Sequence, residues 1–500
     1  MPNAVVLDVR RPAFALKPVA AITGAVVVVL LATSNIYGYH RDELYFRVLG
    51  HHLGWGYIDQ PPLTPLLGRI STAVFGDHLW ALRLPSVLAI AATAVLLALI
   101  ARELGGTAVA QSLAALGVAT NFALVNGHLL LTTSVDAVIW VSVILCILRA
   151  LIRQGDEWWL VAGLVTGIGL YNKHLIVLLL LTVGVGLLIV GPRRVFASRT
   201  LWLGVLIALV VGAPNLIYQA TNGWPQFDMA SALEAHKGHD ARFQFVPFQI
   251  ILLGPPLVPI WIAGFVSLWR RTATRAVAVA YPLMSGLLLV IGGQPYYTEG
   301  LVLALYAAGV VATCRWMGER GGRRGRRLWV VAGVGLNIAV SAVISLPLLP
   351  VSALAKTPIP GINQTVRDQI GWPVYVRQVA AVYTSLPASD RTVAVVIAGN
   401  YGEMGAMVKY GRADGLPAQI YSGQNALYYL ARPPTSATVA VVVGIDNDQF
   451  VTSQFANCVE RGKLNDGVDI DNEEQGRLIR VCRDPVLPWP QLWPRFRHLD

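Results

Sequence analysis

Charged residues are scarce in this chain. Only 13% of its 500 residues are Asp, Glu, Lys or Arg, whereas 55% are hydrophobic. Apolar runs of about 17–24 residues recur along the first 350 positions, and an apolar helix of that length crosses a bilayer. The sequence therefore predicts a polytopic α-helical membrane protein and excludes an ordinary water-soluble enzyme.

The apolar runs divide the chain into a membrane domain, residues 1–350, and a C-terminal segment, residues 351–500. We predict eleven spans, near residues 19–36, 81–101, 107–125, 135–152, 158–174, 175–191, 201–219, 247–269, 276–292, 300–316 and 328–348. Two long loops, residues 37–80 and 220–246, are expected on the outer face, with amphipathic helices lying on the membrane. No internal repeat or low-complexity tract interrupts this organisation.

Acidic residues are outnumbered, and the net charge is +11. The excess lies entirely in residues 1–350, because residues 351–500 hold 14 basic and 14 acidic residues. Its clusters fall in alternate short loops, at Arg10/Arg11/Lys17, Arg102, Arg149/Arg153, Arg193/Arg194/Arg199, Arg270/Arg271/Arg275 and Arg320–Arg327. Basic loops stay in the cytoplasm, so this pattern predicts a cytoplasmic N-terminus and no nucleic-acid partner. Residues 1–33 also resemble a signal peptide, but we expect the first helix to be retained.

The sequence has no Gly-rich phosphate loop followed by Lys and Ser or Thr, so no nucleotide site is predicted.

Cysteines are few, with four in the whole chain. Cys146 and Cys314 fall in or beside predicted spans, where inert thiols are expected. Cys458 and Cys482 lie in the C-terminal segment, on the outer side under this topology. An oxidising compartment allows them to form a disulfide, and two free thiols are the alternative.

The C-terminal segment has a different pattern. β-Branched runs at 392–399 and 437–445 are short, are bounded by turn residues, and predict buried strands. Segments 363–385 and 447–457 have helical spacing. About 150 residues are enough for a separate core, so we predict a soluble α/β domain outside the cytoplasm.

Ionisable residues near the membrane gather on the outer side. Asp42 and Glu43 follow the first apolar span directly, and acids at the mouth of a membrane helix are functional candidates by default. A carboxylate there can remove a proton from an acceptor, and a cation can stabilise charge on a departing phosphate. The candidate carboxylates are Asp42, Glu43 and Asp136, and the candidate cations are Lys173, Arg242, Lys237 and Arg69. The same three carboxylates are the candidate ligands if a divalent metal ion is used.

Each candidate also has a structural interpretation. Asp42 can cap a surface helix or pair with Arg41, and Glu43 can orient Asp42. Asp136 follows Thr-Thr-Ser and can be a helix cap, and Lys173 can extend its ammonium to the interface. Asn400, Tyr401 and Glu403 form a polar cluster that a capped strand-to-helix turn explains equally well.

The motifs of the membrane domain resemble a known family. RDELYF, GYIDQPPL and FGDHLWALRLPS in residues 41–86 resemble the first outer loop and second helix of GT-C glycosyltransferases. The nearer group is the bacterial relatives of protein O-mannosyltransferases and of the aminoarabinose lipid A transferase (glycosyltransferase family 39-like). The later segments LLLTTSVDAVIW, GLYNKHLIVLLL, PNLIYQATNGWPQF and GGQPYYTEGLVLALYAAG agree.

The resemblance implies a GT-C fold, a polyprenyl-phosphate-linked sugar donor and inversion at the anomeric carbon. It also implies a multi-pass protein of the bacterial inner membrane that acts outside the cytoplasm on a glycan, lipid or protein acceptor. The catalytic base carries over to Asp42, with Glu43 beside it, and the second acid carries over to Asp136. The tyrosine pair near the lipid phosphate carries over to Tyr296 and Tyr297.

One departure concerns the donor phosphate. Where the aminoarabinose transferase has a lysine before proline, this chain has Gln60, and a neutral side chain cannot supply that charge. Lys173, Arg242 or a metal ion would then hold the phosphate. Two alternatives to a transferase stay open: a lipid-linked sugar transporter or flippase, and an assembly protein that kept the fold and lost activity. The sequence specifies neither the sugar, the acceptor nor the oligomeric state.

Overall fold

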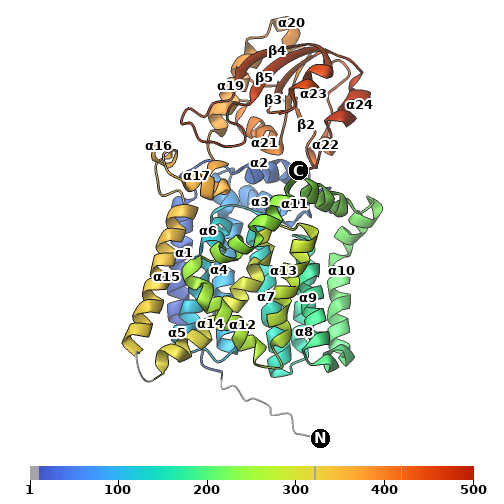
Figure 1. Ribbon diagram of the computed structural model, residues 1–500. Helices are drawn as coiled ribbons and strands as arrows, with labels where there is room; N and C mark the ends of the chain where they lie inside the picture. The colour runs from blue at the N-terminus through green and yellow to red at the C-terminus, as the bar shows by residue number, and fades with distance from the viewer. Residues whose placement is uncertain (1–10, 320–322, 418) are drawn as a thin grey trace.

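The computed structural model describes residues 11–319, 323–417 and 419–500, so the basic residues Arg10 and Arg320 lie outside it. A bundle of helices occupies the lower part of the molecule in Figure 1, and a small sheet with its own helices sits above one end of the bundle. The bundle and its surface helices are α1 (Leu16–Thr33), α2 (Arg41–Gly50), α3 (Leu63–Phe75), α4 (Leu79–Glu103), α5 (Ala108–Ala115), α6 (Asn121–His128), α7 (Thr132–Arg153), α8 (Glu157–Gly169), α9 (Leu175–Ile189), α10 (Arg199–Thr221), α11 (Pro225–Ile251), α12 (Val258–Trp269), α13 (Arg275–Ile291), α14 (Glu299–Gly318) and α15 (Arg323–Ser345).

Six helices in the described part of the chain are long and apolar enough to cross a membrane, or up to eight if two bent pairs each count as one span. Three shorter apolar helices, α3, α9 and α13, accompany them. The multi-pass prediction is therefore confirmed, whereas the count of eleven is not. Residues 107–125 were expected as one span, but α5 and α6 meet there at a bend of 62°.

The two segments that were expected on the outer face are helical. Residues 37–80 contain α2 and α3, which lie between the bundle and the sheet (Figure 1). Residues 220–246 form most of α11. This long helix runs on into the span expected near 247–269, and the chain bends by 70° before α12.

The C-terminal sheet has five strands in the order β2-β1-β3-β5-β4. They are β1 (Ala394–Ala398), β2 (Ile420–Ser422), β3 (Val439–Val443), β4 (Phe455–Lys463) and β5 (Leu478–Pro485). β1 pairs in parallel with β2 and β3, and β5 joins antiparallel strands on both sides. Every residue of β1 and β3 is buried, as predicted for these β-branched runs.

Helices cover the sheet and complete the C-terminal part. They are α16 (Val351–Leu354), α17 (Ile359–Ile362), α18 (Gln364–Arg367), α19 (Trp372–Thr384), α20 (Ala388–Arg391), α21 (Tyr401–Tyr410), α22 (Leu427–Leu430), α23 (Asp448–Ser453) and α24 (Trp489–Leu492). Five 3₁₀ segments, at 116–118, 193–197, 255–257, 295–298 (η4) and 493–496, link elements of the chain. Cys458 and Cys482 form a disulfide between the neighbouring strands β4 and β5. Of the two alternatives, a disulfide or two free thiols, the structure has the disulfide.

Helix α2 joins the bundle to the C-terminal part. Leu44, Tyr45 and Leu49 are buried in the same apolar cluster as Met404 of α21 and Val441 of β3. At Gly405 of α21 a Cβ atom would lie 2.7 Å from the Leu44 backbone, so only glycine permits this close approach. The helix that starts with the candidate base is therefore packed into the core of the C-terminal part.

Candidate functional site

The start of α2 is fixed by a capping box. His40 is the N-cap, and its Nδ1 accepts a hydrogen bond from the Asp42 backbone N–H at 3.2 Å. The Glu43 carboxylate accepts from the His40 backbone N–H at 2.8 Å. Such a reciprocal arrangement satisfies N–H groups that the first turn leaves unpaired. Asp42 is therefore not the cap, and its side chain is available for another role.

Glu43 is fully buried and forms a two-pronged ion pair with Arg83 of α4. Arg83 Nε lies 2.8 Å from Oε1 and Nη2 lies 2.8 Å from Oε2. The Leu130 backbone N–H also donates to Oε1 at 3.0 Å. Arg83 further donates to the backbone carbonyls of Ser34 and Gly38. This network ties the start of α2 to three segments of the bundle.

The Asp42 side chain is one-third exposed and meets a tyrosine from the C-terminal part. The Tyr401 hydroxyl donates to Asp42 Oδ1 at 2.9 Å. Arg41 lies over the Tyr401 ring, 4.8 Å from its centroid, and pairs with Glu473 rather than with Asp42. Asp42 Oδ2 makes no hydrogen bond within residues 11–319, 323–417 and 419–500. One carboxylate oxygen is therefore held and the other is free.

A lysine lies on the tyrosine pair that precedes α14. Lys173 Nζ is 4.4 Å from the ring centroid of Tyr297 and 5.5 Å from that of Tyr296. A cation over a ring face is attracted by the ring quadrupole. The two rings meet edge to face, with centroids 4.9 Å apart. Lys173, which follows α8, thus reaches the 3₁₀ segment η4.

Two carboxylates line a small cavity with these tyrosines. Its walls are Thr133, Asp136, Ala137, Trp140, Tyr296, Tyr297, Glu299 and Gly300. Lys173 lies within electrostatic range of both Asp136 and Glu299. Asn126 donates to Glu299 Oε2 at 2.8 Å. Asp136 Oδ1 and Glu299 Oε1 are buried without a hydrogen-bond partner in the described residues. Buried polar atoms normally have partners, so these two oxygens are suited to contact a ligand.

Asp42 and Lys173 both lie near Tyr296. Asp42 and Tyr401 are within electrostatic range of the Tyr296 hydroxyl, and Lys173 Nζ is 5.5 Å from the centroid of the same ring. A partly exposed carboxylate and a lysine cation thus share one tyrosine as a neighbour. Such a pair can take a proton on one side and stabilise a phosphate on the other.

The fold and one part of the sequence match known proteins. Residues 59–218 match the model of a family described as dolichyl-phosphate-mannose-protein mannosyltransferase. The structure of ArnT from Cupriavidus metallidurans bound to undecaprenyl phosphate is similar, with a TM-score of 0.60 at 16% identity over 93% of this chain and 97% of that chain. The chain has the GT-C fold, and its residues 59–218 are similar to this family of mannosyltransferases.

Two further structures agree with the GT-C fold. ArnT in the apo state gives a TM-score of 0.59 at 15% identity, over 93% of this chain and 97% of that chain. The Archaeoglobus fulgidus oligosaccharyltransferase in complex with Zn and sulfate gives 0.51 at 14% identity, over 85% of this chain and 68% of that chain. No curated protein sequence matches the chain.

The remaining predicted residues of this GT-C chain lie elsewhere. Arg69 lines a different cavity, between α2 and α3. Arg242 donates to Glu234 at 2.8 Å and to backbone carbonyls at the end of α13, and Lys237 pairs with Asp500. Gln60 is buried, and its backbone carbonyl accepts from the Tyr57 N–H. None of the four lines the cavity of Asp136.

One structural interpretation from the sequence is corrected. Asp136 is not a helix cap, because α7 begins at Thr132 and Ser134 closes that turn by accepting from the Leu131 N–H. A shared metal site of Asp42, Glu43 and Asp136 does not fit, because Arg83 and Leu130 occupy both Glu43 oxygens. No group of three or more His, Cys, Asp or Glu side chains among the described residues is arranged to hold a metal ion.

Sequence reasoning missed the role of Tyr401. Asn400 and Glu403 do form the expected capping box at the start of α21. The intervening tyrosine nevertheless points out of that turn to Asp42. A signal was present in the sequence, since a capped turn needs no aromatic residue at its first helical position. The partner of Glu43 was also missed, because Arg83 lies inside an apolar run that showed only its hydrophobicity.

Proposed function

We propose that this chain transfers a sugar from a polyprenyl-phosphate-linked donor to an extracytoplasmic acceptor, with inversion at the anomeric carbon. The observation that carries the proposal is that a partly exposed carboxylate with one free oxygen, Asp42, and a lysine cation, Lys173, both lie near Tyr296. The bound undecaprenyl phosphate in the similar ArnT structure supports a lipid-linked donor here. A membrane GT-C fold with one acid and one cation near the same tyrosine supports the reaction class.

Asp42 acts as the general base. Its free Oδ2 accepts the proton of the acceptor hydroxyl while the acceptor oxygen forms a bond to the anomeric carbon. The bond from that carbon to the phosphate oxygen breaks, and the electron pair leaves with the polyprenyl phosphate. A positioned base contributes roughly 10²–10⁴-fold to such a step. Because the acceptor oxygen attacks the anomeric carbon on the face opposite the departing phosphate, the configuration at that carbon is inverted.

Lys173 stabilises the departing phosphate. Its ammonium forms no ion pair within 4.0 Å among the described residues, although Asp136 and Glu299 lie within electrostatic range, so it is available to a phosphate. Tyr296 and Tyr297 provide hydroxyl donors beside it. In this arrangement Lys173 takes the role of the lysine that the aminoarabinose transferase has at the position of Gln60. Asp136, with an unpartnered oxygen, is assigned to a hydroxyl of the donor sugar.

Glu43 is assigned a positioning role rather than proton transfer. Both of its oxygens are engaged by Arg83 and by backbone N–H groups, so it fixes the first turn of α2 and thereby the Asp42 carboxylate. This assignment differs from the direct role expected at first. The division at residue 350 and an outer location of the C-terminal part are kept as proposals, and a disulfide fits an oxidising compartment.

The test is sugar transfer by the purified chain in proteoliposomes. A panel of polyprenyl-phosphate sugars, labelled in the sugar, is supplied with envelope lipid, glycan and protein acceptors. We expect one donor to release polyprenyl phosphate in step with sugar transfer. If every donor in the panel moves intact across the bilayer without cleavage, the chain is a transporter and the proposal is wrong.

A further inference from the structure

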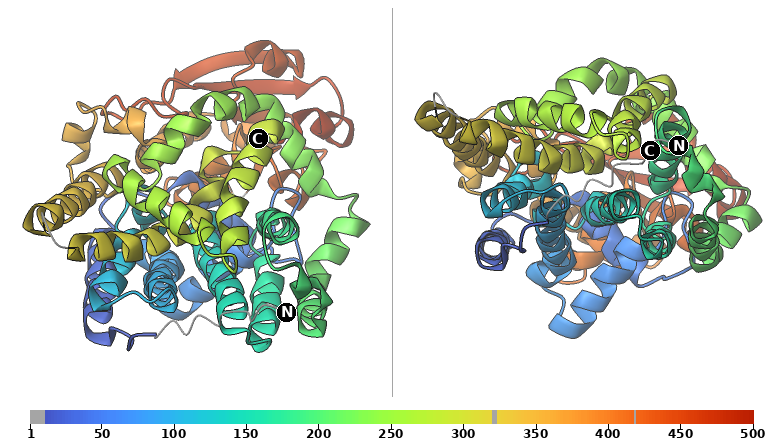
Figure 2. Two further views of the ribbon diagram at one scale, coloured as in Figure 1. Left: turned by 60° about the horizontal axis from the view of Figure 1, so that its bottom comes forward. Right: turned by 90° about the horizontal axis from the view of Figure 1, so that it is seen from below.

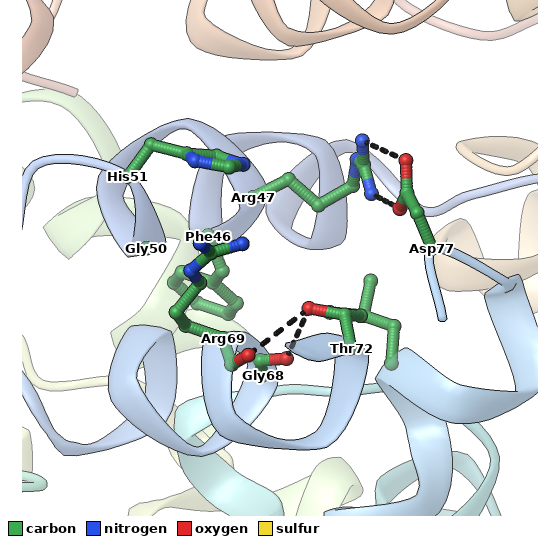
Figure 3. A pocket seen from close by; sticks show the side chains of 9 residues that line it. Phe46, Arg47, Gly50, His51, Gly68, Arg69, Thr72 and Asp77 are labelled. Carbon is green, nitrogen blue, oxygen red and sulfur yellow. Dashed lines mark hydrogen bonds and ion pairs between the residues drawn. The ribbon is translucent and has the colours of Figure 1, made fainter. Parts of the chain in front are cut away.

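A second cavity lies between α2 and α3, apart from the proposed catalytic site. It has a volume of about 120 Å³ and is lined by Phe46, Arg47, Gly50, His51, Gly68, Arg69, Thr72, Asp77 and Leu82. Figure 3 shows these side chains, with Arg47 directed at Asp77 and the Arg69 guanidinium pointing toward His51. No residue of this cavity lines the one that contains Asp136.

The cavity carries excess positive charge. Asp77 is its one acid, and it is held by both Arg47 and Lys409 of α21. Burial acts to raise the pKa of Asp77, but hydrogen bonds from these two cations outweigh it and lower the pKa to about 2. One carboxylate thus faces two paired cations. The Arg69 guanidinium makes no hydrogen bond or ion pair within the described residues.

The pKa of His51 indicates the same excess of positive charge. Burial lowers its pKa, and the charges of Arg69 and Arg47 lower it further. An imidazole whose pKa is lowered beside two guanidinium groups indicates a positive potential that Asp77, which acts to raise this pKa, only partly balances. An arginine whose five N–H donors have no protein partner is arranged for a carboxylate or a phosphate, which it binds with two parallel hydrogen bonds.

Apolar side chains stand beside this charge on α3. Ile70, Val74 and Phe75 are exposed, Val74 by 67%. Seen from below, α3 extends from the edge of the helix bundle (Figure 2), and in Figure 1 it lies level with the outer end of the spans. A helix with this pattern lies in the membrane interface with its apolar side among the lipid tails. The Arg69 guanidinium is then at the depth of the lipid phosphates.

We propose that the α2–α3 cavity binds the anionic phosphate headgroup of a membrane phospholipid, with Arg69 as its principal ligand. His51 and Thr72 line the headgroup pocket, and the lipid tails lie along the exposed face of α3. Arg47 is already paired with Asp77 and contributes charge rather than direct contact. The site is separate from the donor cavity, so the inference does not depend on the transferase reaction.

The experiment is native mass spectrometry of the full chain in detergent, titrated with phosphatidylglycerol. We expect one tightly bound lipid, and Arg69→Gln should weaken its binding by about tenfold, as expected for one charge-assisted contact. Arg69→Lys keeps the charge and should bind within about threefold of the wild type. Arg461→Gln, which removes an exposed arginine from β4, is the matched control and should change nothing.

Two outcomes would overturn the inference. Equal binding of phosphatidylglycerol by the wild type and Arg69→Gln would remove Arg69 from the site. Displacement of the lipid by an equal concentration of inorganic phosphate would assign the cavity to a free anion and exclude the lipid. Phosphatidylcholine, which carries no net charge, should bind more weakly than phosphatidylglycerol, and equal binding would also contradict the proposal.

Discussion

The Tyr401 hydroxyl donates a hydrogen bond to Asp42 across 359 residues of sequence. Tyr401 begins α21 in the C-terminal part, and Asp42 lies in the first turn of α2 at the end of the bundle. The C-terminal part therefore supplies a side chain to the proposed catalytic acid–base group. Its docking on α2, through Leu44 and Gly405, sets the distance between them.

Removing this hydrogen bond tests the role of Tyr401 as a positioning residue. We expect Tyr401→Phe to lower kcat by about tenfold, since a hydrogen bond to a charged group is worth about 1.5–3 kcal/mol. A purely structural tyrosine would lower the amount of folded protein and leave kcat per mole of folded protein unchanged.

Lys173 is expected to act on the donor phosphate. Lys173→Gln should reduce kcat/KM for the lipid-linked donor by about tenfold to a hundredfold, and Lys173→Arg should recover part of the loss. Lys463→Gln, an exposed lysine on β4, is the control for a lost positive charge. An unchanged kcat/KM in Lys173→Gln, measured across donor concentrations, would show that another cation holds the phosphate.

We expect the Glu43–Arg83 ion pair to stabilise the fold rather than to take part in the reaction. Arg83→Met leaves a buried, unpaired carboxylate, a change that costs about 3–5 kcal/mol. We expect a clear drop in Tm, partly restored in Arg83→Met/Glu43→Gln. Glu319→Gln, which breaks the exposed pair with Arg326, should leave Tm nearly unchanged. If the double variant is as unstable as Arg83→Met, the pair is not the cause.

Asp59 predicts a pH dependence of stability. Burial raises its pKa to about 7, and hydrogen bonds from the Tyr45 hydroxyl, at 2.9 and 3.0 Å, offset this only in part. The folded state thus holds the Asp59 proton more tightly than the unfolded chain. Its contribution to stability is fully present below pH of about 4 and is lost as the pH rises to about 7.

Comparison with Asp59→Asn isolates this effect. The wild type should match the variant in Tm at low pH and fall progressively below it up to pH of about 7, with no further change above. Thermal unfolding in detergent between pH 4 and pH 8 gives the difference directly. A Tm difference that is constant over this range would contradict the raised pKa.

The sequence predicted a multi-pass helical protein, whereas the candidate site residues stay a prediction. Asp42 and Asp136 were expected in loops from basic loops and apolar runs, which depend only on local composition, but they lie near the starts of α2 and α7. The predicted count of eleven spans is not confirmed, and bent helices are one reason. Hydropathy at residues 107–125 is continuous across the break between α5 and α6, so the sequence did not indicate the bend. The reach of Tyr401 and the pairing of Arg83 depend on tertiary packing, which no local pattern encodes. The interpretation of Gln60, that the phosphate contact is rearranged, stays a prediction.

The central claim is that Asp42 removes the acceptor proton, and one measurement tests it most directly. Sugar transfer is measured in proteoliposomes for the wild type and Asp42→Asn, with binding of the lipid-linked donor measured in the same preparations. The account predicts that Asp42→Asn binds the donor as the wild type does and transfers at least about a hundredfold more slowly. Full transfer activity in Asp42→Asn would contradict it.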